Sequence, residues 1–124
     1  MRVLVDTHVA LWLIDERDRL SEAATALLGD RANEFLLSAI VVWEIVVKKS
    51  LGKLDAPVDF VGTLMRAGAL PLPLTIEHAE AAADLPWHHR DPFDRMLVAQ
   101  ARTENATLLS ADPRLRAYDV KVTW

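Results

Sequence analysis

Four acidic residues stand out in this 124-residue sequence, because each lies inside an apolar stretch or next to the start of a predicted helix or the end of a predicted strand. They are Asp6, Glu44, Asp94 and Asp112. Carboxylates that converge in a chain without cysteine form an all-oxygen site, which suits Mg²⁺ or Mn²⁺ better than structural zinc. Such ions activate water and stabilise the oxygens of an in-line phosphoryl displacement. The chemistry that this set would support is hydrolysis of a phosphodiester.

Glu44 is the most informative of the four, since it is the only charged residue between Ala39 and Val47. A charge within such an apolar segment is costly unless it is paired or bound to a metal. The alternative is a surface ion pair with Lys48, four residues later and in the favourable order. That alternative requires an exposed glutamate among apolar neighbours, so we favour a role in the site.

The other three acids each have an ordinary alternative role. Asp91 followed by Pro92 predicts a helix cap and a first helical residue, which makes Asp94 a first-turn acid that can simply favour the helix dipole. Asp6 can be only the cap of the first helix, and Asp112 only a turn residue before a proline. We assign Asp91 to the cap and the other three to the site.

The remaining pattern predicts short apolar strands that alternate with helices. The predicted strands are Arg2–Val5, Glu34–Leu37, Ala69–Leu74, Ala106–Ser110 and Val120–Thr123. The predicted helices are Thr7–Ile14, Ser21–Gly29, Ala39–Lys49, Val58–Ala67, Thr75–Leu85 and Asp91–Ala101. The β-branched run from 39 to 49 could also form a strand, and Pro71 and Pro73 place their strand at a sheet edge or argue against it.

This alternation predicts an α/β fold with a mainly parallel sheet. In such sheets the ligand site lies beyond the carboxyl ends of the strands. Asp6 follows the first strand, Asp112 lies just past the strand that ends at Ser110, and Asp94 begins a helix at the same edge. Glu44 lies about 9 Å along its helix, with a side chain that leans back toward that edge.

Length and composition predict one domain spanning 1–124, with 52% hydrophobic and 26% charged residues. The absence of cysteine excludes disulfides and fits a cytoplasmic location. No signal peptide is expected, because Asp6 interrupts the N-terminal apolar run, and no run is long enough to span a membrane. The net charge of −4 argues against nucleic acid, but without the four candidate carboxylates the chain is neutral.

Histidines offer an alternative zinc site. The chain has four, at His8, His78, His88 and His89. They lack a metalloprotease spacing such as H-E-x-x-H, so we expect most of them to be solvated or to support other ligands.

The sequence resembles the PIN-domain nucleases, and specifically the VapC-type toxins of bacterial toxin–antitoxin pairs. The similarity spans essentially the whole chain. The residues that carry it are Val5-Asp6-Thr7-His8, Ser38-Ala39, Trp43-Glu44-Ile45, Lys49, Gly52-Lys53-Leu54, His89-Arg90-Asp91-Pro92-Phe93-Asp94-Arg95 and Leu109-Ser110-Ala111-Asp112. No single motif is specific, but their order and spacing are. Ser110 stands where related chains often carry threonine, which keeps the hydroxyl.

The resemblance implies a three-layer α/β/α domain with Mg²⁺- or Mn²⁺-dependent endoribonuclease activity. It also implies homodimers and inhibition by a cognate antitoxin. By motif position, Asp6, Glu44, Asp94 and Asp112 take the metal-site roles. Apolar residues almost all round the segments 9–14 and 40–47 also favour a protein partner.

Three other classes remain as alternatives. A receiver-like switch domain needs an early acidic pair and a lysine after a late strand, whereas this chain has only Asp6 and places Lys121 within the last strand. A haloacid-dehalogenase-type phosphatase needs D-x-D, and position 8 is histidine. A catalytically silent binding module would not need four intact acids.

An RNA substrate requires cationic side chains near the acids. Arg90, Arg95 and Arg114 are the candidates, and the sequence does not rank them. The alternative for Arg95 is an ion pair with Asp91 on its own helix.

Overall fold

A five-stranded sheet, in which every strand is parallel to its neighbours, forms the centre of the computed structural model, which describes residues 1–124. The strands are β1 (Arg2–Val5), β2 (Glu34–Ser38), β3 (Leu70–Leu72), β4 (Thr107–Leu109) and β5 (Val122–Thr123). Their order across the sheet is β3-β2-β1-β4-β5. In the register of the central strands, Leu4 lies opposite Leu36 and Leu108. The predicted parallel α/β sheet is confirmed.

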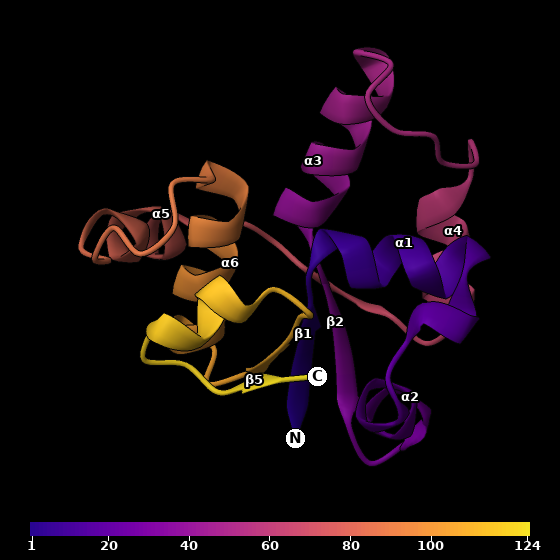
Figure 1. The fold of residues 1–124 in the computed structure, drawn as a ribbon, viewed down its shortest axis with the longest axis horizontal. Coiled ribbons are helices and arrows are strands. Elements are labelled where there is room, and N and C mark those ends of the chain that lie inside the picture. The colour runs from indigo at the N-terminus through magenta and orange to yellow at the C-terminus, as the bar shows by residue number, and fades with distance from the viewer.

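Helices cover both faces of this sheet. They are α1 (Thr7–Asp15), α2 (Glu22–Gly29), α3 (Ala39–Ser50), α4 (Phe60–Arg66), α5 (Ile76–Ala83) and α6 (Pro92–Thr103), with short 3₁₀ helices η1 (Arg17–Arg19) and η2 (Pro113–Ala117). Figure 1 shows α1, α2 and α4 on one side of the sheet and α5 and α6 on the other, while α3 extends beyond the carboxyl ends of the strands. The three-layer α/β/α arrangement is thus confirmed. None of the helices has the length and apolar character needed to cross a membrane.

The core lies along the central strands. Val3, Leu4 and Val5 of β1 have no exposed surface, and Leu108 and Leu109 of β4 have none either. Strands that are buried on both faces read as continuous apolar runs, which is how these two strands appear in the sequence. The apolar core therefore holds the ends of β1 and β4 in place.

The segment from 39 to 49 is a helix, which settles the alternative that its β-branched residues left open. The hydroxyl of Ser38 caps it by accepting the N–H of Ile40 at 3.0 Å. At the other end Gly52 has a φ of +70°, and the N–H of Lys53 donates to the carbonyl of Lys48 at 2.8 Å. These capping contacts and the burial of one face outweigh the strand preference of the individual residues.

Several predicted boundaries shift by one or two residues in the structure, and two of these differences have a local cause. The fourth helix begins at Phe60 rather than Val58, because Pro57 starts a turn in which the N–H of Phe60 donates to the carbonyl of Pro57 at 3.2 Å. The third strand is only three residues long and forms an edge of the sheet. Pro71 has no N–H to donate and fits an edge position.

Candidate active site

The strand order reverses between β1 and β4, since β2 and β3 extend the sheet on one side of β1 and β4 returns to the other. Open parallel sheets bind ligands beyond the carboxyl ends of the strands at such a point. Asp6 follows β1 directly, and Asp112 lies three residues after β4. Two of the predicted acids therefore lie at the reversal point.

Asp6 is buried, and each of its carboxylate oxygens accepts a hydrogen bond. Oδ1 accepts the N–H of Val9 at 2.9 Å, which makes Asp6 the cap of α1. Oδ2 accepts the hydroxyl hydrogen of Ser110 at the end of β4. Burial raises the pKa of Asp6, and the hydrogen bond from Ser110 opposes that shift. The capping role predicted as an alternative is present, and it uses only one of the two oxygens.

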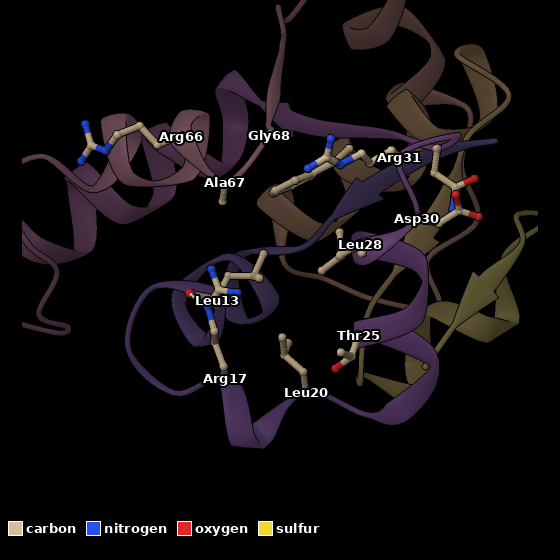
Figure 2. Close-up of a pocket in the computed structure, with 13 residues that line it drawn as sticks. Leu13, Arg17, Leu20, Thr25, Leu28, Asp30, Arg31, Arg66, Ala67 and Gly68 are labelled. Atoms are coloured by element: carbon tan, nitrogen blue, oxygen red, sulfur yellow. Dashed lines mark hydrogen bonds between the residues drawn. The ribbon is translucent and has the colours of Figure 1, made fainter.

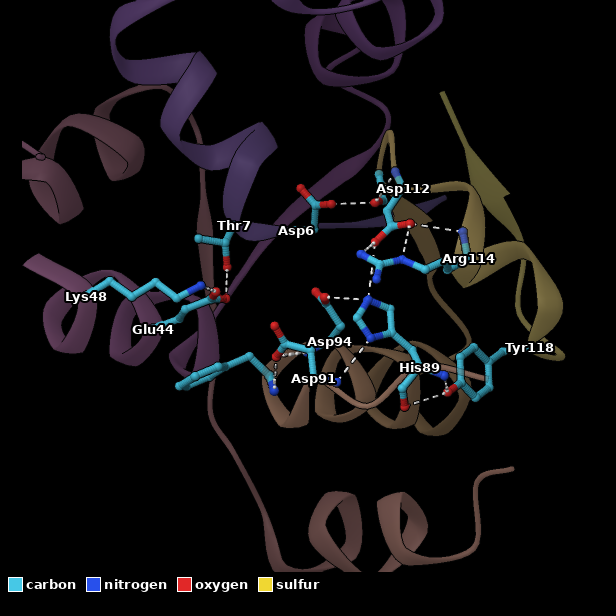
Figure 3. A network of polar contacts seen from close by, with 12 residues as sticks. Asp6, Thr7, Glu44, Lys48, His89, Asp91, Asp94, Asp112, Arg114 and Tyr118 are labelled. Atoms are coloured by element: carbon cyan, nitrogen blue, oxygen red, sulfur yellow. Dashed lines mark hydrogen bonds and ion pairs between the residues drawn. The ribbon is translucent and has the colours of Figure 1, made fainter. Parts of the chain in front are cut away.

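Asp91 and Asp94 make different contacts at the start of α6, and Asp91 is its cap as predicted. Oδ1 of Asp91 accepts the N–H of Phe93 at 2.8 Å and that of Asp94 at 3.4 Å, so Asp91 is the cap. The carboxylate of Asp94 makes no capping contact and lies against the ring of His89 (Figure 3). Burial, followed by the charge of Asp91, raises the pKa of Asp94 to about 6. Asp94 is therefore a partly buried acid whose negative charge is not offset by a hydrogen bond from its own helix.

His89 lies between two of the acids. Its Nε2 is 3.1 Å from Oδ2 of Asp94 and 3.3 Å from Oδ2 of Asp112. Its Nδ1 accepts the N–H of Asp91 at 3.1 Å, which assigns the proton of a neutral imidazole to Nε2. Its backbone N–H donates to the hydroxyl of Tyr118 at 2.9 Å. His89 thus lies against both carboxylates and donates a hydrogen bond to Asp112.

Glu44 is only 4% exposed, as its apolar surroundings predicted. Oε1 accepts the hydroxyl hydrogen of Thr7, and Oε2 pairs with the ammonium of Lys48 at 2.5 Å. The ion pair with Lys48 therefore exists, but it belongs to a buried glutamate and not to the exposed one that the alternative required. The negative charge of Glu44 also raises the pKa values of Asp6 and Asp94, which shows that the three acids are close.

Asp112 is held by the residue two positions later. Its Oδ1 accepts the backbone N–H of Arg114 at 2.9 Å, so it also caps η2, and the guanidinium of Arg114 binds both of its oxygens. These contacts lower the pKa of Asp112 to about 2. Asp112 is therefore ionised at neutral pH and anchored to its own turn.

The four predicted acids face one space at the carboxyl edge of the sheet (Figure 3). Ligand atoms of His89, Asp94 and Asp112 lie within 4.8 Å of one another. Asp6 and Glu44 stand around this trio but are not members of it. Carboxylate oxygens dominate the set, and neither Asp6 nor Asp94 forms an ion pair with a lysine or an arginine, whereas Glu44 pairs with Lys48 and Asp112 with Arg114. This donor set fits Mg²⁺ or Mn²⁺, which prefer carboxylates and water as ligands.

His89 is the member of the cluster that the sequence did not single out. Its spacing matches no metal motif, and its contacts to Asp112 and Tyr118 span 23 and 29 residues. The available signal was its position two residues before the cap of α6, which makes it part of the loop that delivers Asp94. No local pattern shows that β4 and η2 return to that loop.

Arg95, one of the predicted RNA contacts, is instead buried within the fold. Its guanidinium donates to the carbonyls of Ala82, Leu85 and Pro86 at 2.9–3.1 Å, and it lies 3.7 Å from the ring centroid of Trp87. These hydrogen bonds satisfy carbonyl groups at and just after the end of α5. Arg95 forms no ion pair with Asp91, which was the alternative. A buried arginine that satisfies three carbonyl groups is unavailable to RNA, so this prediction is wrong.

One hollow of the molecule lies away from the acids. It has a volume of about 630 Å³ and is formed by residues from α1, η1, α2 and the end of α4 (Figure 2). Its lining includes Leu13, Leu28 and Phe35, with Arg17 and Arg66 near its opening. None of the four acids lines it. The acids therefore lie at the carboxyl edge of the sheet and outside this hollow.

Comparison with known proteins gives the family. The model of the PIN domain family matches residues 3–121. Ribonuclease VapC22 from Mycobacterium tuberculosis (strain ATCC 25618 / H37Rv) is 29% identical over 119 residues, which cover 94% of this chain and 91% of that protein.

Solved structures share the fold at low sequence identity. VapBC2 from Rickettsia felis, bound to a DNA fragment from its promoter, superposes with a TM-score of 0.74 at 14% identity and covers 99% of this chain and 98% of that one. VapC20 from Mycobacterium tuberculosis, described as a toxin that cleaves the sarcin–ricin loop, gives 0.70 at 17% identity and covers 95% of each chain. With a family match over nearly its whole length and the same fold in these structures, the chain belongs to the PIN domain family.

Proposed function

We propose that this protein is an Mg²⁺- or Mn²⁺-dependent endoribonuclease and the toxin of a toxin–antitoxin pair. One observation carries the proposal: Asp94 and Asp112 lie together beyond β1 and β4, and Asp6 and Glu44 face the same space. The similar VapC22 is named a ribonuclease, and VapC20 is described as a toxin that cleaves the sarcin–ricin loop. Family membership and the acidic site point to the same reaction.

The four acids would hold the cation, which when bound activates water and stabilises the negative oxygens of the phosphodiester during hydrolysis. The surrounding donors fix where each acid points. Ser110 orients Asp6, Thr7 and Lys48 orient Glu44, and the bridge through His89 orients the remaining two. Such contacts behind the ligands hold a site in its productive geometry before substrate arrives.

RNA is proposed as the substrate despite the net charge of −4. The excess negative charge equals the four site acids, so a bound divalent cation offsets much of it where the phosphate would lie. The side chains of Lys48 and Arg114 add positive charge at the same edge. The local field therefore suits a polyanion better than the overall charge does.

Protein partners are proposed from the same family. The solved structures of similar fold include VapBC complexes from Rickettsia felis and nontypeable Haemophilus influenzae, and we propose a cognate antitoxin for this chain. We also propose a cytoplasmic homodimer that uses the outer side of α3, because Trp43, Val46 and Leu51 are exposed there in spite of their apolar character. Light scattering that finds a strict monomer would contradict the homodimer.

A cleavage assay tests the proposed reaction. The purified protein is incubated with a mixed RNA pool in Mg²⁺, in Mn²⁺ and in EDTA, beside a Glu44→Gln variant whose folding is checked by circular dichroism. We expect cleavage only with a divalent cation and none by folded Glu44→Gln, since the buried carboxylate is lost while its volume is kept. Undiminished cleavage in EDTA would refute the metal requirement.

A further inference from the structure

Asp112 has every lone-pair position of its carboxylate in use. Oδ1 accepts the backbone N–H of Arg114 at 2.9 Å and the Nε–H of the same residue at 3.1 Å. Oδ2 accepts Nη2 of Arg114 at 2.9 Å and Nε2 of His89 at 3.3 Å. An ionised carboxylate offers about four such positions. A cation can therefore bind Asp112 only if one of these donors leaves.

The guanidinium of Arg114 is the donor that can leave most easily. Its side chain is 65% exposed, and Asp112 is its only polar partner. His89, by contrast, is buried and is held from behind by Asp91 and Tyr118. The backbone N–H of Arg114 is fixed in the first turn of η2. Because exposed ion pairs contribute little to stability, the guanidinium can turn away at small cost.

A released Arg114 would stay beside the reacting phosphate, because its backbone remains hydrogen-bonded to Asp112 (Figure 3). A guanidinium binds a phosphate through two parallel hydrogen bonds. Among the arginines considered for RNA, Arg95 is buried in its contacts with α5, and Arg90 contacts none of the site acids. Of these three arginines, only Arg114 already binds one of the site acids.

We propose that Arg114 exchanges partners: it holds Asp112 in the metal-free protein and turns to a phosphate of the RNA backbone when a divalent cation takes Asp112. The inference rests on the proposed function and adds a residue and an order of events to it. It predicts opposite effects from one substitution, because loss of the guanidinium frees Asp112 for the cation but removes a phosphate contact. If the guanidinium only positioned Asp112 for the cation, its loss would weaken cation binding instead.

The first measurement is calorimetric titration of Mn²⁺ into wild type, Arg114→Gln and Arg116→Gln. Arg116 is an exposed arginine of the same helix η2 without an ion pair, so its variant removes the same charge without freeing Asp112. We expect Arg114→Gln to bind Mn²⁺ about two- to fivefold more tightly than wild type, the factor that corresponds to one exposed ion pair. Arg116→Gln should stay within twofold of wild type.

The second measurement is the anisotropy of a labelled single-stranded RNA whose phosphorothioate linkages slow hydrolysis, so that all four acids are kept. In saturating Mn²⁺, Arg114→Gln should weaken binding and lower the slope of log affinity against log salt by about 0.7, the value for one phosphate contact. Arg114→Lys keeps the positive charge and should keep most of the slope. In EDTA the effect of Arg114→Gln should be much smaller, because the wild-type guanidinium then remains on Asp112.

These measurements distinguish a failure of the partner exchange from a failure of the proposed function. Unchanged or weaker Mn²⁺ binding by Arg114→Gln, with normal binding by wild type, would overturn the exchange and leave the proposed function standing. An equal loss of RNA affinity with and without Mn²⁺ would also overturn it. A wild-type protein that binds no Mn²⁺ would contradict the proposed function and the exchange together.

Discussion

His89 Nε2 lies 3.1 Å from Oδ2 of Asp94, on the helix that follows the loop of His89. The same nitrogen donates a hydrogen bond to Oδ2 of Asp112, just past β4, at 3.3 Å. Because the Nδ1 atom accepts the N–H of Asp91, the bridging nitrogen is a donor even when the ring is neutral. The metal-free site therefore keeps two acids together through one imidazole.

Replacement of His89 by alanine tests this bridge. We expect His89→Ala to unfold with about 1–3 kcal/mol less free energy than wild type in EDTA, because Asp112 loses a hydrogen-bond donor and Asp94 loses its nearest polar contact. Mn²⁺ should recover part of this loss, since a ligand that binds only the native state stabilises it. The measurement is urea unfolding with and without Mn²⁺. An equal loss under both conditions would mean that His89 supports the fold and not the acidic site.

The raised pKa of Asp94 predicts how stability depends on pH. The pKa is about 6 in the folded protein against an ordinary value of 3.8, so ionised Asp94 destabilises the native state. The penalty is present in full above pH 6, amounts to about 1–3 kcal/mol, and is relieved as the pH falls toward 4. Asp94→Asn should thus raise the melting temperature of the metal-free protein at pH 8, with a gain that shrinks toward pH 4.5.

The matched control for this pH dependence is Asp55→Asn, which removes an exposed carboxylate that forms no ion pair. Its effect on melting should be small at both pH values. If the melting temperature of Asp94→Asn were below that of wild type at pH 8, Asp94 would stabilise the apo protein and the repulsion among the acids would be overestimated.

Arg95 is predicted to stabilise the fold. Arg95→Met keeps much of the side-chain volume but leaves the carbonyls of Ala82, Leu85 and Pro86 without their donor. We expect a loss of about 2–4 kcal/mol in urea unfolding. Arg102→Met, on the exposed side of the same helix, should change stability by less than about 0.5 kcal/mol. Equal effects of the two substitutions would refute the contacts of Arg95.

Local patterns in the sequence were sufficient for most of the fold. The apolar runs of β1 and β4 and the caps at Ser38 and Asp91 are short-range signals, and each has its predicted structure. The acids at the strand ends could be placed together because all parallel strands point their carboxyl ends to one edge.

Long-range contacts account for what the sequence could not provide. The bridge by His89 depends on η2 returning to the loop before α6, and the burial of Arg95 depends on α5 ending against α6. Neither contact has a periodicity or a spacing that reveals it. An arginine next to an acidic motif reads as a surface charge until the carbonyl groups that it satisfies are known.

The central claim is that Asp94 is a metal ligand, whereas Asp91 is only the cap of α6. The most direct measurement is thermal melting of wild type, Asp94→Asn and Asp91→Ala with and without Mn²⁺, beside RNA cleavage by the same samples. Asp91→Ala should lose about 0.5–2 kcal/mol of stability and keep its response to Mn²⁺. Asp94→Asn should melt no lower than wild type without metal, and should lose both the Mn²⁺ response and cleavage. A variant Asp94→Asn that melts lower but keeps its Mn²⁺ response and its activity would contradict the account.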